Sequence, residues 1–282
     1  MTHTLKNLGL TAALAVMMAA CTPAPKKDAA PAADAPKTDA PATAAAPTKI
    51  VFGTDAAYAP FEMKDASGKI IGFEIDLATA MCAEIKAECT FQDQAFDGII
   101  PALEAKKFDA ILSSMSMTAE RKEKVDFTQK IWSSPSSFLG AEAIGTDITP
   151  ASMKDKIIAV QKGTVQENYI KANFKDSKIK SYDTIELAYA DLAAKRADLV
   201  LADTGVIDDF LKSAKGKNFK ELVKVPESVD PKAFGDGIGI AVRKGDKALL
   251  DQLNKGFDAI RANGKYKEIA DKYFKYDIYT GK

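Results

Sequence analysis

Gly72-Phe-Glu-Ile-Asp-Leu-Ala-Thr-Ala-Met81 is the stretch of sequence that decides the fold class. Apolar side chains recur at positions 73, 77, 81 and 85, and also at 75, so we predict a helix over 73–85 that begins just after Gly72. Two short apolar runs flank this helix, 49–54 before it and 90–94 after it, and both have the length of strands. A strand, a helix and a strand in this order form the unit of an α/β fold.

The same alternation continues along the chain. After a loop at 55–61, we expect a helix at 96–105 and strands at 110–113, 157–160, 179–182 and 199–202. Further helices are expected at 165–174, 184–193, 247–261 and 266–274, and a last strand at 234–242. Two successive βαβαβ series predict an α/β fold with parallel sheets.

Composition excludes several classes of function. The chain has 282 residues with 39 basic and 39 acidic side chains, and no basic stripe stands out, so we expect no nucleic-acid partner. The only histidine, His3, lies in the segment that we expect to be removed. A Ser-His-Asp triad, a Cys-His pair and a histidine-ligated zinc site are therefore excluded. We expect no catalytic residue, metal or cofactor.

The N-terminus predicts export and a lipid anchor. Lys6 precedes the apolar run Leu8–Ala20, which is shorter than the roughly 20 residues that span a bilayer and is typical of a secretory signal over 1–20. The small residues before Cys21 resemble a bacterial lipobox, with Met18 where an aliphatic residue is usual. We expect cleavage before Cys21 and its diacylation. The alternatives are an uncleaved membrane-anchoring helix and cleavage by an ordinary signal peptidase.

Residues 22–48 predict a tether. They contain eleven alanines, six prolines and no aromatic residue, which is too little apolar surface to offset the entropy of ordering. We therefore expect residues 21–48 to form a lipidated cysteine and a disordered linker that gives the folded part reach from a membrane.

Two cysteines remain if Cys21 carries lipid. Cys82 and Cys89 form an even pair in a chain that we expect to be exported, and such a pair predicts a disulfide. The alternative, a metal site built on two cysteines, lacks further ligands.

Several motifs, in order along the chain, resemble family 3 of the bacterial extracellular solute-binding proteins, and in particular its members that bind lysine, arginine and ornithine. The similarity covers essentially all of 49–281. The motifs that carry it are 53–61 (GTDAAYAPF), 72–81, 96–103 (FDGIIPAL), 113–121 (SSMSMTAER), 163–166 (GTVQ), 191–194 (DLAA) and 234–237 (FGDG).

This resemblance implies a two-lobe periplasmic binding protein fold of type II, joined by two hinge strands. Lobe 1 would comprise 49–133 plus 235–282, and lobe 2 would comprise 137–229. A basic L-amino acid would bind between the lobes, which close around it by hinge bending. The protein would be a periplasmic, lipid-anchored monomer that delivers this ligand to the permease of an ABC transporter.

The resemblance also implies how the ligand's α-carboxylate and α-ammonium are bound. Arg121 would grip the carboxylate bidentately, and Asp203 would pair with the ammonium. Alternatively, Arg121 could lie on a solvent-exposed helix face, and Asp203 could cap the N-terminus of a helix. The further contacts would come from the hydroxyls of Ser113, Ser114 and Ser116, which could instead be turn formers, from the backbone of Thr164 and Val165, and from Gln166.

Four residues would contact the ligand's side chain and determine specificity. Tyr58 and Phe96 would flank its alkyl or guanidinium portion, and Asp55 would meet its distal charge, although an acid in this loop can also serve to structure it. Arg121, Asp55 and Asp203 together carry a charge of −1, which a basic ligand neutralises. Gln161 matches the arginine-specific branch of the family and favours arginine, ahead of lysine, ornithine and histidine.

Two other classes of function remain open at this point. One is an enzyme on the same fold, such as a dehydratase, for which Glu62, Glu74 and Asp203 are candidate general acid–base groups. The other is a sensor or adhesin that the tether displays.

Overall fold

The computed structural model describes residues 48–280. The predicted signal, the lipidation of Cys21 and nearly all of the predicted tether lie outside these residues. Among the described residues, no helix combines the length and the apolar composition that crossing a membrane requires.

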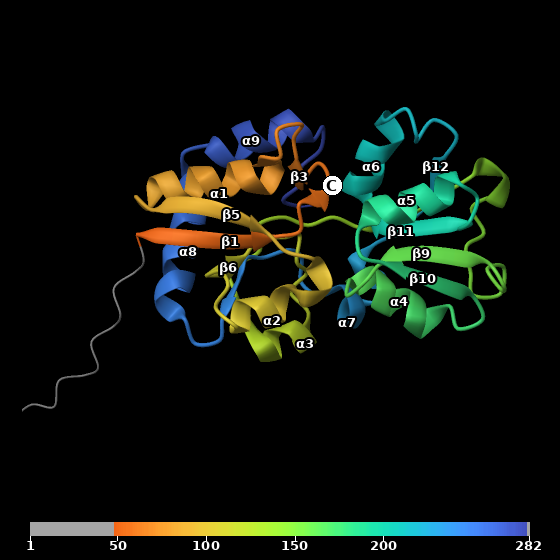
Figure 1. Ribbon diagram of the computed structural model, residues 1–282, viewed down its shortest axis with the longest axis horizontal. Helices are drawn as coiled ribbons and strands as arrows, with labels where there is room; N and C mark the ends of the chain where they lie inside the picture. Colours follow the sequence, from red (N-terminus) through yellow and green to blue (C-terminus); the bar gives the residue numbers. More distant parts are fainter. Residues whose placement is uncertain (1–47, 281–282) are drawn as a thin grey trace, which may run out of the picture. The chain divides into compact units, whose positions relative to one another are not determined.

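The first sheet has the strand order β5-β1-β6-β13-β7. Helices α1, α8 and α9 lie along one side of it, and α2 and α3 lie on the other (Figure 1). We call this part lobe 1. Its strands are β1 (Lys49–Thr54), β5 (Glu88–Asp93), β6 (Ala110–Ile111), β7 (Val125–Phe127) and β13 (Ala241–Arg243), and its helices are α1 (Phe73–Glu84), α2 (Ile99–Glu104), α3 (Ala119–Lys124), α8 (Lys247–Ala262) and α9 (Lys265–Tyr273).

The second sheet has the strand order β10-β9-β11-β8-β12 and forms lobe 2. Its central strand is β11, whose residues Leu199 and Leu201 pack in the hydrophobic cluster that contains residues of α4, whereas Val200 and Ala202 pack in the cluster that contains residues of α5. Both faces of β11 are therefore covered, which explains its continuous run of apolar residues. The elements are β8 (Ser136–Gly140), β9 (Ile157–Gln161), β10 (Lys178–Tyr182), β11 (Leu199–Asp203), β12 (Lys220–Val225), α4 (Val165–Asn173), α5 (Ile185–Ala193), α6 (Thr204–Lys212) and α7 (Pro231–Phe234).

The prediction of parallel sheets is wrong for two strands. β13 pairs antiparallel with β6 and β7, and β8 pairs antiparallel with β11 and β12. Each of them is the first strand after the chain passes from one sheet to the other, so neither follows the helical crossover that makes neighbouring strands parallel. The helical crossovers join the strands that do pair in parallel, β1 with β5 and β6, and β9 with β10 and β11.

Three local predictions also fail. The expected strand over 234–242 shrinks to β13, because Gly235 (φ +78°) and Gly237 (φ +91°) take conformations that no strand allows. The expected loop at 55–61 contains the first strand of a small antiparallel sheet, which consists of β2 (Ala57–Tyr58), β3 (Glu62–Lys64) and β4 (Ile70–Ile71). The helix expected from Phe96 begins as a single 3₁₀ turn, Phe96–Gly98.

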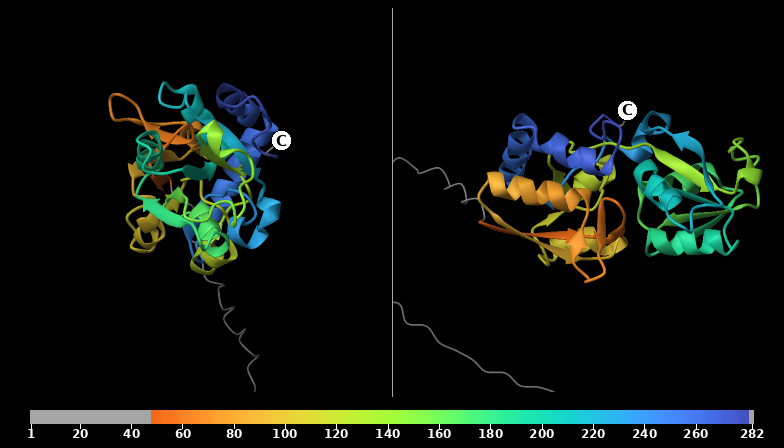
Figure 2. Two further views of the ribbon diagram at one scale, coloured as in Figure 1. Left: turned by 90° about the vertical axis from the view of Figure 1, so that its right-hand side faces the viewer. Right: turned by 90° about the horizontal axis from the view of Figure 1, so that it is seen from above.

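The chain crosses between the lobes twice, after β7 and after β12. The two crossings meet where Ser133 Oγ donates to the carboxylate of Glu227, 2.9 Å from each oxygen. Ser133 N also donates to Ile278 O over 2.9 Å. The C-terminal segment therefore lies beside the connections, as both Figure 1 and the right-hand view of Figure 2 show. The predicted residue bounds of the two lobes stay a prediction.

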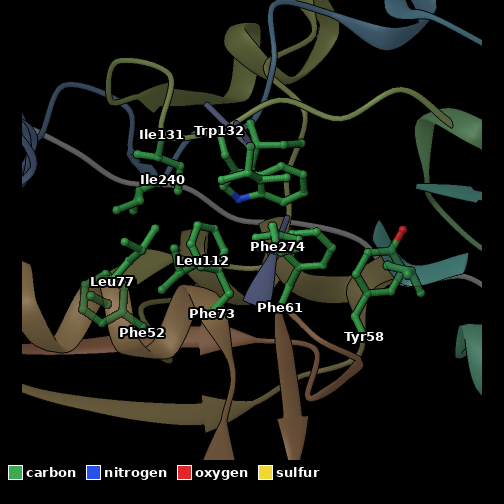
Figure 3. Close-up of a cluster of buried hydrophobic side chains, with 14 of the residues drawn as sticks. Phe52, Tyr58, Phe61, Phe73, Leu77, Leu112, Ile131, Trp132, Ile240 and Phe274 are labelled. Atoms are coloured by element: carbon green, nitrogen blue, oxygen red, sulfur yellow. The ribbon is translucent and has the colours of Figure 1, made fainter. Parts of the chain in front are cut away.

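An aromatic cluster fills the part of lobe 1 nearest to lobe 2 (Figure 3). The rings of Phe61 and Trp132 stack with centroids 4.2 Å apart and planes only 6° from parallel, and Phe274 packs beside them. Trp132 is fully buried, and its Nε1 donates to Glu74 Oε1 over 2.6 Å. This bond holds a carboxylate in the core, directly behind the site described below.

As predicted, a disulfide joins Cys82 of α1 to Cys89 of β5. The two cysteines are seven positions apart, and closing so short a loop in the unfolded chain contributes about 2–3 kcal/mol to the free energy of unfolding. We expect the Cys82→Ser/Cys89→Ser variant to lose that amount in a urea titration. Mass spectrometry of the unreduced protein after alkylation should find neither thiol modified, and two alkylated thiols would contradict the bond.

Candidate ligand-binding site

A small cavity lies between the two lobes. All twelve candidate ligand-binding residues predicted from the sequence line it, and so does Glu62, for which the sequence indicated only a candidate acid–base role. The lining residues are Asp55, Tyr58, Glu62, Phe96, Ser113, Ser114, Ser116, Arg121, Gln161, Thr164, Val165, Gln166 and Asp203.

These residues converge because they follow the carboxyl ends of parallel strands. Asp55 comes directly after β1, and Ser113 lies just beyond β6. In lobe 2, Gln161 is the last residue of β9 and Asp203 the last of β11. Loops at the carboxyl ends of parallel strands meet at one edge of the sheet, which is where open α/β folds bind their ligands.

Arg121 is held on α3 by contacts to both lobes. Its Nη1 donates to Ser116 O in lobe 1 and its Nη2 to Gly163 O in lobe 2, each over 3.0 Å. The guanidinium carbon lies 5.3 Å from the centre of the Phe96 ring. Burial lowers the pKa of Arg121 to about 10, so the side chain stays charged at neutral pH. Two of its five N–H groups are used by these carbonyls, and a fixed guanidinium of this kind suits bidentate binding of a carboxylate.

The first turn of α4 lies opposite Arg121. Thr164 caps this helix, since its Oγ1 accepts from Glu167 N over 3.2 Å and donates to Gln161 O over 2.7 Å. The hydroxyl of Thr164 is therefore engaged within lobe 2. The backbone N–H groups at a helix N-terminus have no acceptor inside the helix and favour an anion.

Asp203 is buried at the end of β11 with hydrogen bonds to both oxygens. Tyr58 OH donates to Oδ2 over 2.7 Å, and Gln166 Nε2 donates to Oδ1 over 2.9 Å. Asp203 occupies the N-cap position of α6, but its side chain makes no capping bond. The alternative role as a helix cap is therefore wrong for the carboxylate. Burial raises the pKa of Asp203 to about 7.

Asp55 contacts lobe 2 through Gln161. Gln161 Nε2 donates to Asp55 Oδ2 and also lies 3.3 Å from Asp183 O, and Ser113 Oγ accepts from Asp55 N over 2.9 Å. Burial raises the pKa of Asp55 to about 6, against the opposing effect of the Gln161 hydrogen bond. A buried carboxylate whose ionised form is disfavoured gains from a cationic partner.

Glu62 lines the cavity although its sequence context did not predict this position. It lies on β3, is fully buried, and lies 3.3 Å from Ser114 Oγ, which donates to its Oε2. A single acid between Phe61 and Met63 carries no periodic signal, and the small sheet that orients it was expected to be partly a loop. Its position was therefore not recognisable from the pattern alone.

Further contacts join the lobes at the rim of the cavity. Lys162 Nζ of lobe 2 forms an ion pair with Asp97 of lobe 1 over 2.6 Å. Together with the bonds Arg121–Gly163, Asp55–Gln161 and Tyr58–Asp203, it holds the two lobes against each other around the site. Among residues 48–280, no group of three or more acidic, cysteine or histidine side chains could hold a metal ion.

The sequence model of the bacterial extracellular solute-binding proteins, family 3, matches residues 50–276. The chain belongs to this family. The predicted membership is therefore confirmed. This solute-binding protein is 43% identical over 230 residues to the L-arginine-binding protein of Pseudomonas aeruginosa, an alignment that covers 80% of this chain and 88% of that protein. It is 42% identical over 238 residues to the histidine-binding periplasmic protein of Salmonella typhimurium, covering 83% and 91% of the two chains.

A solved structure supports the same assignment. A Salmonella typhimurium periplasmic binding protein described as highly specific for arginine superposes with a TM-score of 0.75 at 34% identity, covering 80% of this chain and 99% of that one. The solute-binding protein therefore has the two-lobe periplasmic binding protein fold, as predicted. The roles of the individual cavity residues stay predictions.

Proposed function

We propose that this solute-binding protein captures a basic L-amino acid in the cavity between its lobes and delivers it to the permease of an ABC transporter. The observation that carries the proposal is the combination of the fixed guanidinium of Arg121 with the buried carboxyl groups of Asp55 and Asp203 in one cavity. The relatives named for arginine and histidine support the same class of ligand.

The three charged groups correspond to the three charges of a basic amino acid. In this proposal Arg121, with the first turn of α4, binds the α-carboxylate, and Asp203 binds the α-ammonium. Asp55 binds the distal cation, and the rings of Tyr58 and Phe96 flank the chain between the two ends. Ser113, Ser114 and Ser116 complete the lobe 1 wall.

Charge balance favours a basic ligand over a neutral one. Arg121 contributes +1 and the two aspartates −2, and Glu62 counts as neutral because burial raises its pKa well above the ordinary value. The site therefore carries −1, and a ligand with a net charge of +1 makes the sum zero. An unpaired charge in a buried site costs several kcal/mol. Arginine is our first choice, because the amide of Gln161 adds a polar group beside Asp55.

Calorimetry on protein stripped of ligand by unfolding and refolding tests the proposal. We expect one site per chain, with arginine bound more tightly than lysine, ornithine or histidine, and all four bound more tightly than glutamine or glutamate. Preference for a neutral or acidic amino acid would refute the basic-ligand assignment. Consumption of the ligand would instead favour an enzyme.

We also propose that the protein is a periplasmic monomer anchored to a membrane by lipid on Cys21. The Cys21→Ser variant should be recovered without an acyl mass and in the uncleaved form, because the acceptor of the lipid is absent. Membrane fractionation and intact mass measure both effects. A mature wild-type chain that starts at any other residue would contradict the anchor.

A further inference from the structure

Glu62 has a buried oxygen without a hydrogen-bond partner. Both the residue and its Oε1 are fully buried, and among residues 48–280 no donor reaches that atom. Thr54, Tyr189 and Tyr276 also bury a hydroxyl without a partner among residues 48–280, but they do not line this cavity, whereas Glu62 does. A buried polar atom that stays unpaired is destabilising, so an oxygen without a partner in the wall of a binding site points to a donor on the ligand.

The other oxygen of Glu62 belongs to a network centred on Ser114. Ser114 Oγ donates to Glu62 Oε2 over 3.3 Å, and Ser114 N donates to Glu74 Oε2 over 3.0 Å. Ser114 has a φ of +49°, which is an unusual conformation for a serine and turns both of its polar groups toward these two acids. One residue thus holds two fully buried carboxyl groups side by side.

Ionising both of these adjacent buried carboxyl groups is energetically unfavourable. Glu74 has two N–H donors, Ser114 N and Trp132 Nε1, which stabilise its ionised form. Glu62 has the hydroxyl of Ser114 as its one donor, and it shares a hydrogen bond with the Glu74 side chain that favours the neutral form of Glu62, so the proton lies on Glu62. Burial, the adjacent Glu74 and the more distant Asp55 all raise the pKa of Glu62 well above its ordinary value.

We propose that Glu62 is a further specificity-determining residue, which stays uncharged and accepts through Oε1 a hydrogen bond from the distal group of the bound basic amino acid. The inference rests on the proposed function. A neutral Glu62 also keeps the charge count of the site at −1, so that a basic ligand still balances it.

This assignment favours a guanidinium over an ammonium. One oxygen of Asp55 already accepts from Gln161, so a ligand with many N–H groups needs a second acceptor nearby. The guanidinium presents five N–H donors in a rigid plane and can reach Asp55 and Glu62 together, whereas the lysine ammonium presents three donors at one point. Glu62 therefore contributes more to the binding of arginine than to that of lysine.

The test compares Glu62→Met with Glu62→Gln by calorimetry on ligand-free protein. Methionine keeps the length and burial of the side chain but lacks an acceptor, so arginine affinity should fall by about tenfold or more and lysine affinity by less. Glutamine can donate to Glu74 and present its carbonyl oxygen to the ligand, as the neutral acid does, so Glu62→Gln should recover most of the loss. The matched control is Asp109→Asn, which changes a carboxylate of lobe 1 outside the cavity and should leave affinity unchanged.

Each other outcome overturns the inference. An affinity for arginine within threefold of wild type in Glu62→Met would remove Glu62 from the site. Equal losses of affinity for arginine, lysine and glutamine would show that Glu62 does not contact the distal group of the ligand. A loss of affinity in Glu62→Gln as large as that in Glu62→Met would show that the ionised form of Glu62 binds the ligand. Melting temperatures without ligand identify a folding defect, in which case the Glu62→Gln comparison alone decides. A wild type without affinity for basic amino acids would instead refute the proposed function.

Discussion

The Arg121→Ala variant should lose measurable binding of every amino acid. The lost contact is to the α-carboxylate that all of these ligands share, and removing one partner of a buried ion pair costs about 3–5 kcal/mol. The loss should therefore be at least a hundredfold for arginine, lysine and histidine alike. Calorimetry with all three ligands measures it, and micromolar affinity in the variant would remove Arg121 from the site.

Arg121 also joins the lobes through Ser116 O and Gly163 O, so its loss must be separated from a folding defect. Arg243 offers a matched control in lobe 1, since it too is partly buried and donates to a backbone carbonyl, Phe108 O, over 2.6 Å. Arg243→Ala should lower the melting temperature and leave affinity unchanged. Arg121→Lys should recover only part of the binding, because an ammonium supplies the charge without the bidentate geometry.

The Asp55→Asn variant should bind basic amino acids more weakly without losing affinity for neutral ones. It keeps the shape of the side chain but removes the charge that we assign to the distal cation. Affinity for arginine or lysine should fall by at least about 2 kcal/mol, roughly thirtyfold, because hydrogen bonds between charged partners contribute about twice as much as neutral ones. Affinity for glutamine or citrulline should hold or improve, because the site then carries no net charge.

Asp93→Asn is the matched control for Asp55. Asp93 lies close to the same loop, where its Oδ1 accepts from Ala56 N over 3.1 Å, but it does not line the cavity. Its neutralisation should change the affinity for arginine by less than threefold. Similar losses in the two variants would indicate a general electrostatic effect, and equal losses for basic and neutral ligands in Asp55→Asn would mean that Asp55 only shapes its loop.

The elements that sequence predicts well are those whose own residues determine them. The periodic apolar residues of α1 predict a helix, and the apolar run of β11 predicts a buried strand. Both predictions hold because any α/β unit supplies neighbouring elements that cover these apolar residues. The antiparallel directions of β8 and β13 depend on where the chain changes lobes, which no local pattern records. The break at Gly235 likewise depends on a distant neighbour, because a Cβ there would lie 2.7 Å from Met117 O.

The candidate site shows the same division. Asp203 and Arg121 stand at recognisable places, after a buried strand and within a motif of the family, so both could be named in advance. The contacts between site residues could not be predicted. Gln161 and Asp55 are 106 positions apart, and the pairing of Glu62 with Glu74 depends on the unusual backbone of Ser114. Such contacts arise only when the tertiary structure brings the segments together.

The position of Trp132 gives the protein a built-in optical reporter. It is the only tryptophan in the chain, so all indole fluorescence comes from one place. That indole is stacked on Phe61, bonded to Glu74 and adjacent to the first crossing between the lobes. A ligand that reorganises the acids of the cavity or the angle of the crossing changes the surroundings of this single emitter. Ligand titrations and stopped-flow kinetics can therefore be followed without any label, with a signal that originates from one known residue.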